Sequence, residues 1–258
     1  MSLVGRVALV TGGGRGIGRA VARALSEAGA AVAVAARTLD QVEAVAKELS
    51  QAGSKALGVG LDVTDPDSVE SAVGSVGMEL GPVDILVNNA GIASSAPIAR
   101  TSLEEWEHLF QVNATGTFLC TRAVLPGMTE GGWGRVVNVA SVAGLTGAPY
   151  IAAYAASKHA QIGFTRAVAA EVARTGVTVN AVCPGYVDTP MTRESVARIQ
   201  ERTGRTEEEA LEALRRQNPQ GRLIQPEEVA HAVLGFCAPE ARGLNGQALV
   251  LDGGQLLA

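Results

Sequence analysis

A glycine-rich segment near the start of the chain limits the fold more than any other feature. The apolar segment Val7–Thr11 runs directly into Gly12-Gly-Gly-Arg-Gly-Ile-Gly18, and a helical pattern begins at Gly16. Glycines allow the backbone to turn sharply and approach a ligand closely, and the amino end of a helix attracts anions such as phosphate. Glycine clusters also make ordinary turns, but a position between the first strand and the first helix favours a dinucleotide-binding loop. We therefore expect an α/β sheet with a nucleotide at its edge.

Short aliphatic segments alternate with longer amphipathic segments along the chain of 258 residues. Several aliphatic segments are apolar at nearly every position, which is typical of strands covered on both faces. The repeated strand-then-helix order predicts a single-domain doubly wound Rossmann fold over residues 1–258, with a seven-stranded parallel sheet. The expected strands are Val7–Thr11, Ala31–Ala36, Lys55–Leu61, Ile85–Val87, Arg135–Ala140, Val177–Cys183 and Ala248–Leu251. The expected helices include Gly16–Ala28, Leu39–Gln51, Asp67–Leu80, Leu103–Leu125 and Ala152–Arg174.

Residues 186–225 interrupt this alternation before the last helix and strand. Their central part, Arg193–Arg216, is charged and helix-prone. In open α/β sheets the ligand binds outside the carboxyl ends of the strands. An insertion that follows a strand is therefore expected to be a helical substrate lid, and a solvated helical excursion without a role is the alternative.

Composition and charge argue against several classes of protein. The net charge is −5 and aromatic residues make up 3%, whereas a nucleic-acid surface needs a basic stripe and often aromatic stacking platforms. No apolar run is long enough for a membrane span, and the amino-terminal residues lack a signal-peptide pattern. We expect a cytoplasmic protein with no nucleic-acid or membrane partner. Cys120, Cys183 and Cys237 show neither zinc-ligand spacing nor a disulfide framework, so we interpret them as buried thiols and expect no metal.

Four motifs follow one another along the chain. They are Gly12-x-x-x-Gly16-x-Gly18, Asn88-Asn-Ala-Gly91, Ser141 followed by Tyr154-Ala-Ala-Ser-Lys158, and Pro184-Gly185 with Thr189. In these motifs the chain resembles the short-chain dehydrogenase/reductase family, and the resemblance extends over essentially the whole sequence to Leu251-Asp-Gly-Gly254. The resemblance implies an enzyme that interconverts a carbonyl and an alcohol with a nicotinamide cofactor.

The end of the second expected strand indicates which cofactor is used. Enzymes that bind NAD commonly place an acidic residue there to bond the ribose 2′-hydroxyl, but this chain reads Val34-Ala-Ala-Arg37. Arginine suits a 2′-phosphate because its planar guanidinium donates two parallel charge-assisted bonds. Arg37, with Arg15 in the glycine loop, therefore favours NADP(H), and NAD(H) stays as the second choice.

The family resemblance also implies which residues hold the cofactor. They are Gly12, Arg15, Gly16, Ile17, Gly18, Arg37, Asp62, Val63, Asn89, Gly91, Tyr154, Lys158, Pro184, Gly185, Val187 and Thr189. Among them, Asp62 and Val63 would meet the adenine, and Asn89 would lie near a ribose.

Tyr154 and Lys158 lie four residues apart in a helical pattern, so their side chains share one helix face. A free phenol has a pKa near ~10. An ammonium one turn away and an oxidised nicotinamide both stabilise the phenolate, so we expect a lowered pKa that suits general acid–base catalysis. An isolated pair with this spacing is more often a packed tyrosine and a solvated lysine. The assignment therefore depends on the glycine loop and on Ser141.

Ser141 follows the fifth expected strand, at the sheet edge where ligands bind. The resemblance implies that Ser141 bonds the reacting carbonyl oxygen, that Tyr154 donates the proton, and that Lys158 binds the nicotinamide ribose. It also implies that Asn113 holds a water linking Lys158 to solvent. The alternatives are a turn or cap serine and a hydrogen-bonded amide inside a helix.

The segment Ala173–Met191 looks like the matching part of bacterial 3-oxoacyl reductases, which act on acyl-carrier-protein or coenzyme A thioesters, and of polyketide ketoreductases. Two departures leave the substrate open, because Gly91 is followed by Ile-Ala-Ser-Ser-Ala-Pro rather than Pro-Gly-Gly, and Met128–Gly134 lacks a basic cluster. We expect a reductase of a 3-oxoacyl thioester or of a small ketone. The alternatives are an NAD-dependent alcohol or sugar dehydrogenase of the same family and a non-catalytic nucleotide-sensing member. The resemblance also implies a homotetramer.

Overall fold

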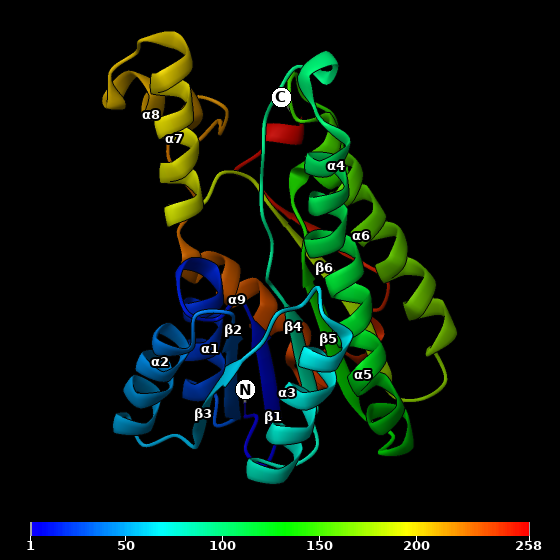
Figure 1. The fold of residues 1–258 in the computed structure, drawn as a ribbon. Coiled ribbons are helices and arrows are strands. Elements are labelled where there is room, and N and C mark those ends of the chain that lie inside the picture. The colour runs from blue at the N-terminus through cyan, green and yellow to red at the C-terminus, as the bar shows by residue number, and fades with distance from the viewer. Residues whose placement is uncertain (1, 258) are drawn as a thin grey trace.

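All seven expected strands form one parallel sheet. The structure, a computed structural model, describes residues 2–257. The strands are β1 (Val7–Thr11), β2 (Ala31–Ala36), β3 (Ala56–Gly60), β4 (Ile85–Asn88), β5 (Gly134–Val139), β6 (Val177–Pro184) and β7 (Ala248–Leu251). They lie in the order β3-β2-β1-β4-β5-β6-β7, and every neighbouring pair is parallel (Figure 1). The predicted single-domain doubly wound fold is confirmed.

Helices cover both faces of this sheet. The α-helices are α1 (Gly16–Glu27), α2 (Leu39–Gln51), α3 (Pro66–Glu79), α4 (Leu103–Phe110), α5 (Gly116–Glu130), α6 (Ala152–Glu171), α7 (Pro190–Thr203), α8 (Glu207–Arg215) and α9 (Pro226–Cys237). Shorter turns are η1 (Ile98–Arg100), η2 (Gln111–Thr115), η3 (Val142–Gly144), η4 (Pro239–Gly243) and η5 (Gln255–Leu257). Helices α1, α2 and α9 pack on the face that carries Val10 and Val34, and α3, α5 and α6 pack on the face that carries Leu9 and Ala33. Because successive strand residues point to opposite faces, burial on both faces explains the uninterrupted apolar strands.

The strand order reverses between β1 and β4. Strands β2 and β3 lie on one side of β1, whereas β4 pairs with its other side. The connections therefore leave the two central strands in opposite directions and open a crevice at their carboxyl ends. At this edge Thr11, the last residue of β1, is bonded to the segment that follows β4. Its hydroxyl oxygen accepts hydrogen bonds from the N–H groups of Asn89 and Ala90 at 3.1 and 3.0 Å. The glycine loop and the Asn-Asn-Ala-Gly motif thus meet at the crevice.

The long helix expected over Leu103–Leu125 is divided in the structure. Helix α4 ends at Phe110, a π-helical turn covers Gln111–Thr115, and α5 continues to Glu130. Such turns are often found at functional sites, and this one contains Asn113. Elsewhere the expected strand and helix boundaries agree with the structure to within three residues, and the largest difference is at α6, which ends at Glu171 rather than Arg174.

The insertion over residues 186–225 contains a helical hairpin. Helices α7 and α8 turn at Gly204, whose φ of 70° suits glycine, and they bury a small apolar core that includes Val196, Ala210 and Leu214. Figure 1 shows both helices projecting beyond the sheet at the end where β6 leads into α7. The predicted helix-rich excursion is therefore present beside the carboxyl edge.

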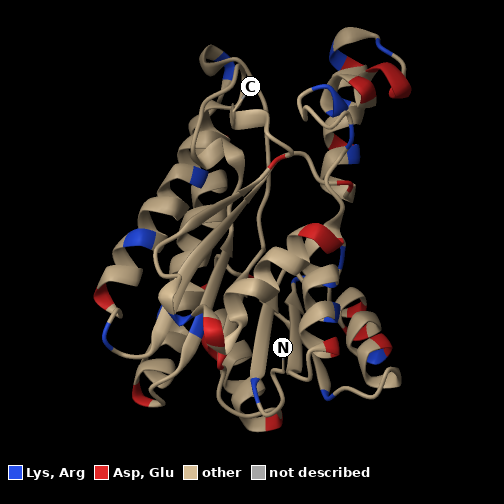
Figure 2. Cartoon of the chain, turned by 180° about the vertical axis from the view of Figure 1, so that it is seen from behind, with Lys and Arg blue, Asp and Glu red and all other residues tan. Residues whose placement is uncertain are grey.

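Charge on the described surface is mixed. Figure 2 shows acidic and basic residues interspersed on α7 and α8 and scattered elsewhere, without a continuous basic stripe in that view. Within residues 2–257, no helix is both long and apolar enough to cross a membrane. The same residues contain no group of three or more His, Cys, Asp or Glu side chains placed to hold a metal ion.

Candidate active site

The glycine loop after β1 has a conformation that side chains would block. Gly12 and Gly16 have φ values of 63° and 53°, a backbone region that L-residues with a Cβ rarely adopt. A Cβ on Gly18 would overlap the Gly12 carbonyl oxygen, and one on Gly13 would lie 2.5 Å from a methyl carbon of Val34. Glycine is therefore needed here for the tight turn and for the close packing of α1 against the loop.

The amino end of α1 is open to a ligand. Its N-cap residue, Arg15, has an extended backbone and makes no side-chain capping bond, and the first turn carries no acidic residue. The first N–H groups of a helix have no partner within the helix, and the helix dipole makes this end electropositive. A pyrophosphate supplies the acceptor oxygens and the negative charge that this end lacks, so the loop fits a dinucleotide.

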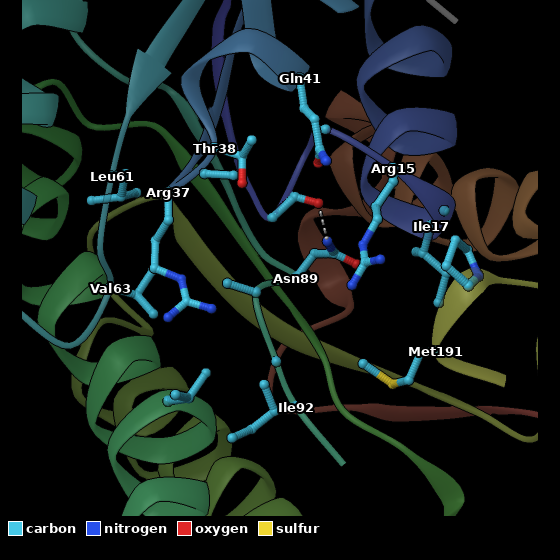
Figure 3. Close-up of a pocket in the computed structure, with 18 of the residues that line it drawn as sticks. Arg15, Ile17, Arg37, Thr38, Gln41, Leu61, Val63, Asn89, Ile92 and Met191 are labelled. Carbon is cyan, nitrogen blue, oxygen red and sulfur yellow. Dashed lines mark hydrogen bonds between the residues drawn. The ribbon is translucent and has the colours of Figure 1, made fainter. Parts of the chain in front are cut away.

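A cavity of about 420 Å³ opens beside the glycine loop (Figure 3). It is lined by Gly12, Gly14, Arg15, Gly16, Ile17, Ala36, Arg37, Thr38, Gln41, Leu61, Asp62, Val63, Asn89, Ala90, Gly91, Ile92, Val112, Thr189, Pro190 and Met191. Most of the residues expected to hold the cofactor are therefore brought together. Gly18, Pro184, Gly185, Val187, Tyr154 and Lys158 are expected cofactor residues that do not line this cavity.

Several wall residues were not predicted from the sequence. Thr38 is the N-cap of α2 and Gln41 lies in its first turn, and Ile92, Val112 and Met191 come from three further segments. A signal existed for Thr38 and Gln41, because they lie one and four positions after Arg37, which follows the end of β2. The other three carry no polar motif, and only the fold brings them to the cavity.

Arg15 and Arg37 both extend their guanidinium groups into this cavity, from the glycine loop and from the end of β2 (Figure 3). Both residues are exposed. Arg15 also pairs with Glu194 of α7, with 3.4 Å between Nη2 and Oε1. The wall beside Arg37 is completed by Asp62, whose pKa is lowered mainly by hydrogen bonds from the N–H and hydroxyl groups of Thr64, with a smaller contribution from Arg37. Two cations on opposite walls suit an additional phosphate on the ribose.

Asn89 holds the glycine loop in place. Its Nδ2 donates to the carbonyl oxygens of Thr11 and Gly12 at 3.0 and 3.1 Å. Asn89 lines the cavity as expected, but its amide nitrogen is engaged with the loop rather than turned toward a ribose. The described contacts therefore give it a supporting role in the shape of the cradle.

The Pro-Gly motif and Thr189 lie where β6 leads into α7. Gly185 packs against Asp252, since a Cβ on this glycine would lie 3.3 Å from the Asp252 Cβ. Val187 forms a parallel bridge with Ile224. Thr189 is the N-cap of α7, where its hydroxyl accepts from the Thr192 N–H at 3.4 Å, and it also lines the cavity. This motif thus joins β6 to the base of α7.

Ser141 and Tyr154 meet at the carboxyl end of β5. Ser141 caps η3, with its Oγ accepting from the Ala143 N–H at 3.1 Å, so the alternative of a cap serine is also satisfied. Tyr154 lies in the first turn of α6. Desolvation by burial raises the pKa of Tyr154, and a side-chain hydrogen bond with Ser141 acts in the opposite direction. The two hydroxyl groups predicted to act on one carbonyl are therefore neighbours.

The direction of the Tyr154 pKa differs from the prediction. A lowered value was expected from Lys158 together with an oxidised nicotinamide, but among the protein's own groups burial dominates and the pKa of Tyr154 is raised. Lys158 Nζ lies 6.0 Å from the centre of the Tyr154 ring, and its hydrogen bonds go to Val139 and Gln161. Tyr186 and Cys183 add smaller raising contributions to the Tyr154 pKa. Burial cannot be read from a four-residue spacing, which is why the part of the prediction that rests on Lys158 gives the wrong direction.

Lys158 of α6 is buried against β5, with 4% of its surface exposed. Its Nζ donates to the Val139 carbonyl oxygen and to Gln161 Oε1, both at 3.0 Å. Burial lowers the pKa of Lys158 to about 8. A Cβ on the cavity-lining Gly91 would lie 3.6 Å from Nζ, so the ammonium group lies just behind that part of the cavity wall.

Asn113 connects three segments of the site. Its Oδ1 accepts from the Ile92 N–H at 2.9 Å, and its Nδ2 donates to the Ile92 carbonyl at 3.0 Å and to Ser157 Oγ at 2.9 Å. Ser157 in turn donates to the Tyr154 carbonyl oxygen at 2.8 Å. The amide is fully used inside the protein, which matches the alternative of a satisfied interior amide. Its side chain therefore fixes the loop after β4 against the start of α6.

Comparisons with known proteins agree with this geometry. Residues 6–200 match the family model described as short chain dehydrogenase. A 3-oxoacyl-(acyl-carrier-protein) reductase of Vibrio cholerae is 41% identical over 257 residues, covering 100% of both chains. The structure of a single-substitution variant of actinorhodin polyketide ketoreductase with NADPH superposes with a TM-score of 0.94 at 42% identity, covering 97% of both chains. A gluconate 5-dehydrogenase of Burkholderia cenocepacia, in complex with NADP and tartrate, gives a TM-score of 0.91 at 35% identity, covering 100% of this chain and 97% of that one. The chain therefore belongs to the short-chain dehydrogenase family of NAD(P)-dependent oxidoreductases.

Proposed function

We propose that this enzyme uses NADPH to reduce a ketone to a secondary alcohol, and that its substrate is a 3-oxoacyl thioester or a small ketone. The observation that carries the proposal is the placement of Arg15 and Arg37 on one cavity whose wall at Gly91 adjoins the buried Lys158. The reductases named above, at 41% and 42% identity over nearly the whole chain, support the ketone as the substrate class.

In the proposed reaction, different residues of the site have different roles. The glycine loop and the amino end of α1 would hold the pyrophosphate, and Arg15 and Arg37 would hold the 2′-phosphate. Bound NADPH supplies the hydride that adds to the carbonyl carbon. Ser141 donates a hydrogen bond to the carbonyl oxygen, and Tyr154 donates a proton to it. Lys158, with one N–H left after its bonds to Val139 and Gln161, donates to the nicotinamide ribose.

The raised pKa of Tyr154 suits the direction of reduction. A phenol whose pKa lies above its ordinary value stays protonated at neutral pH. It is then ready to give its proton to an oxygen that gains negative charge during reduction. Asn113 and Ser157 support the carbonyl of Tyr154 and so fix the first turn of α6.

Residues 186–225 act in this proposal as a substrate lid. Arg202 Nη1 at the end of α7 donates to the Ser95 carbonyl oxygen at 2.6 Å, and Glu194 in the same helix pairs with Arg15. The hairpin is therefore joined to the loop after β4 and to the glycine loop, on two sides of the crevice. Such contacts allow a lid to respond to a ligand beneath it.

The proposal includes a homotetramer in the cytoplasm. Leu249 and Val250 of the edge strand β7 are 43% and 37% exposed, and Phe118 of α5 is 41% exposed. Exposed apolar side chains on an edge strand and a helix face are suited to burial by further copies. Light scattering should give four times the 26.4 kDa chain mass, and a monomer would contradict the assembly.

A panel of carbonyl substrates tests the proposed reaction. Acetoacetyl-CoA, small ketones, sugars and a steroid ketone are each offered with NADPH and with NADH, and cofactor oxidation is followed by the absorbance of the reduced nicotinamide. We expect the highest kcat/KM for acetoacetyl-CoA or a small ketone with NADPH. A second candidate is a sugar-acid dehydrogenase, because one of the similar structures is a gluconate 5-dehydrogenase at 35% identity. Gluconate oxidation with NADP⁺ that exceeds every ketone reduction would replace the first proposal.

A further inference from the structure

A chain of buried side chains leads from Lys158 to the π-helical turn. Lys158 Nζ donates to Gln161 Oε1 at 3.0 Å, and Gln161 Nε2 donates to Thr117 Oγ1 at 2.9 Å. Thr117 Oγ1 then donates to the Asn113 carbonyl oxygen at 2.9 Å. Every member of this chain is buried, with exposures of 4% for Lys158, 1% for Gln161, 3% for Thr117 and 0% for Asn113.

We infer that Gln161 is a positioning residue for Lys158, which holds the ammonium group at the cofactor site by accepting one of its hydrogen bonds while Thr117 fixes the amide. The inference rests on the proposed function, in which Lys158 binds the nicotinamide ribose. It extends that function to a residue outside the tyrosine–serine–lysine motif. No other side chain among the described residues accepts a hydrogen bond from Lys158, because its second acceptor is the Val139 carbonyl.

The orientation of the Gln161 amide follows from its two neighbours. A lysine ammonium only donates hydrogen bonds, so the atom that faces Nζ is the amide oxygen. The amide nitrogen then faces Thr117, whose hydroxyl proton is already given to the Asn113 carbonyl and whose oxygen accepts. In this arrangement every hydrogen-bond donor faces an acceptor. A flipped Gln161 amide would instead place its NH₂ group against the Lys158 ammonium, so that two donors would face each other.

The two bonds of Lys158 determine where its third N–H points. Val139 belongs to β5 and Gln161 lies one helical turn after Lys158 in α6, so the two acceptors belong to different elements of the fold. Fixing two of the three ammonium protons also fixes the direction of the remaining one. The cavity wall at Gly91 lies close to Nζ. Gln161 therefore keeps the free proton of Lys158 directed for use at the cofactor site.

An amide in this place positions rather than relays protons. A relay through Gln161 would require its Nε2 to give up a proton to Thr117, and a primary amide does not do so near neutral pH. The chain also ends at a backbone carbonyl rather than at a proton donor. Its function is therefore to keep Lys158 charged and correctly aimed, because a hydrogen bond to the charged form favours that form.

The surroundings of Lys158 make this one acceptor important. The other titratable groups near it are Tyr154 on α6 and Cys183 on β6, and the structure places no carboxylate in contact with Nζ among residues 2–257. Burial raises the pKa of Cys183 to about 11 and also raises the pKa of Tyr154, so both are neutral at pH 7 to 8. The buried ammonium of Lys158 is therefore stabilised only by neutral hydrogen-bond acceptors.

The pH dependence of NADPH binding tests the inference without requiring a substrate. The dissociation constant of NADPH is measured by cofactor fluorescence between about pH 6 and 9.5 for the native enzyme, Gln161→Leu, Gln161→Glu and Thr117→Val. Leucine removes the acceptor of the Lys158 hydrogen bond, so we expect NADPH binding at pH 8 to weaken about tenfold. The midpoint, which is the pH at which half of the NADPH affinity is lost, should move down by about one pH unit. Glutamate adds a carboxylate beside the ammonium, so we expect the midpoint to move up. For Thr117→Val we expect about threefold weaker binding, because the amide loses its fixed partner.

The exposed Gln51→Leu substitution at the end of α2 is the matched control and should leave the profile unchanged. Thermal unfolding shows whether each variant is folded. If Gln161→Leu does not fold, the inference is tested with Gln161→Glu and Thr117→Val alone. Midpoints that coincide in every folded variant, or that move the same way for leucine and glutamate, would overturn the inference. An enzyme that binds NADPH as expected but reduces no ketone would contradict the proposed function and leave the role of Gln161 intact.

Discussion

Arg15 in the glycine loop forms an ion pair with Glu194 in α7, with 3.4 Å between Nη2 and Oε1. The pair joins the glycine loop to the hairpin of α7 and α8. Both side chains are more than half exposed, so the pair itself contributes little to stability. Its importance lies in the charge balance at the cavity, because a 2′-phosphate and the Glu194 carboxylate would compete for one guanidinium group.

Replacement of Glu194 by glutamine should strengthen NADPH binding. The substitution removes one negative charge near the proposed phosphate site and releases Arg15, so we expect the Kd for NADPH to fall about two- to fivefold at low salt. NADH, which lacks the 2′-phosphate, should bind nearly as before. Fluorescence titration with both cofactors measures the effect, and Glu171→Gln at the end of α6 is the control. Equal changes for the two cofactors would show that Arg15 does not meet the 2′-phosphate.

Replacement of Arg37 by aspartate should reverse the cofactor preference. The change removes a charge-assisted donor and supplies the acid that bonds a ribose 2′-hydroxyl in NAD enzymes. We expect the ratio of kcat/KM for NADPH to that for NADH to fall about 10- to 100-fold. The exposed Arg174→Asp, just after α6, controls for a change in net charge. A ratio that stays at the native value would refute the assignment of Arg37.

Much of the fold and the cofactor loop could be predicted because their signals are local. The glycines of the loop follow from the turn that they make, and the missing acid at the end of β2 is visible in the residues themselves. The division of the long helix was not predicted, and Asn113 in its π-helical turn bonds to Ile92, 21 positions earlier, a contact that local sequence does not show. Gln161 was also missed, because its bond to Thr117 spans 44 positions and the burial of both side chains is a tertiary property.

The predicted pKa of Tyr154 shows where such reasoning fails. Sequence spacing placed Lys158 one turn away, and the structure keeps both residues on α6. The sign of the pKa shift, however, depends on how much water reaches the phenol and on which acceptors hold the ammonium. Both are tertiary properties, and they give a raised value for Tyr154 and a lowered one for Lys158.

Removal of the Tyr154 hydroxyl should nearly abolish turnover. In Tyr154→Phe the ring still packs at the start of α6, but no group donates the proton, so we expect kcat to fall by about 10²- to 10⁴-fold. NADPH affinity and thermal stability should change little, since the cavity walls are intact. The exposed Tyr150→Phe removes a phenol four positions earlier and serves as the control. Turnover within about tenfold of the native rate would contradict the role of Tyr154 as proton donor.

The lowered pKa of Lys158 predicts the alkaline limit of the reaction. Its ammonium form is present below a pKa of about 8 and is lost as the pH rises through that value. In the proposed mechanism, ketone reduction needs both the charged lysine and the protonated tyrosine, whose pKa is raised. We therefore expect kcat/KM for NADPH to be level at neutral pH and to decline above about pH 8. A profile measured from pH 6 to 10 that stays level throughout would show that Lys158 does not control it.

Glu228 at the start of α9 should make stability depend on acid. Its carboxylate accepts from Arg222 at 2.6 and 2.8 Å and from the Gln225 N–H at 2.7 Å, and these bonds lower its pKa from 4.5 to about 2. A carboxyl group whose pKa is lowered in the folded state contributes stability at pH values above its unfolded pKa. That contribution is lost as the pH falls from about 4.5 toward 2.

The Glu228 side chain is 35% exposed, so solvent screening limits the effect. We expect Glu228→Gln to lower the free energy of unfolding by about 0.5 to 1 kcal/mol at pH 7. Urea unfolding at pH 7, 5 and 4 should give the same difference at the first two values and a smaller one at the third. A difference that is unchanged at pH 4 would mean that the glutamate acts through packing rather than through its charge.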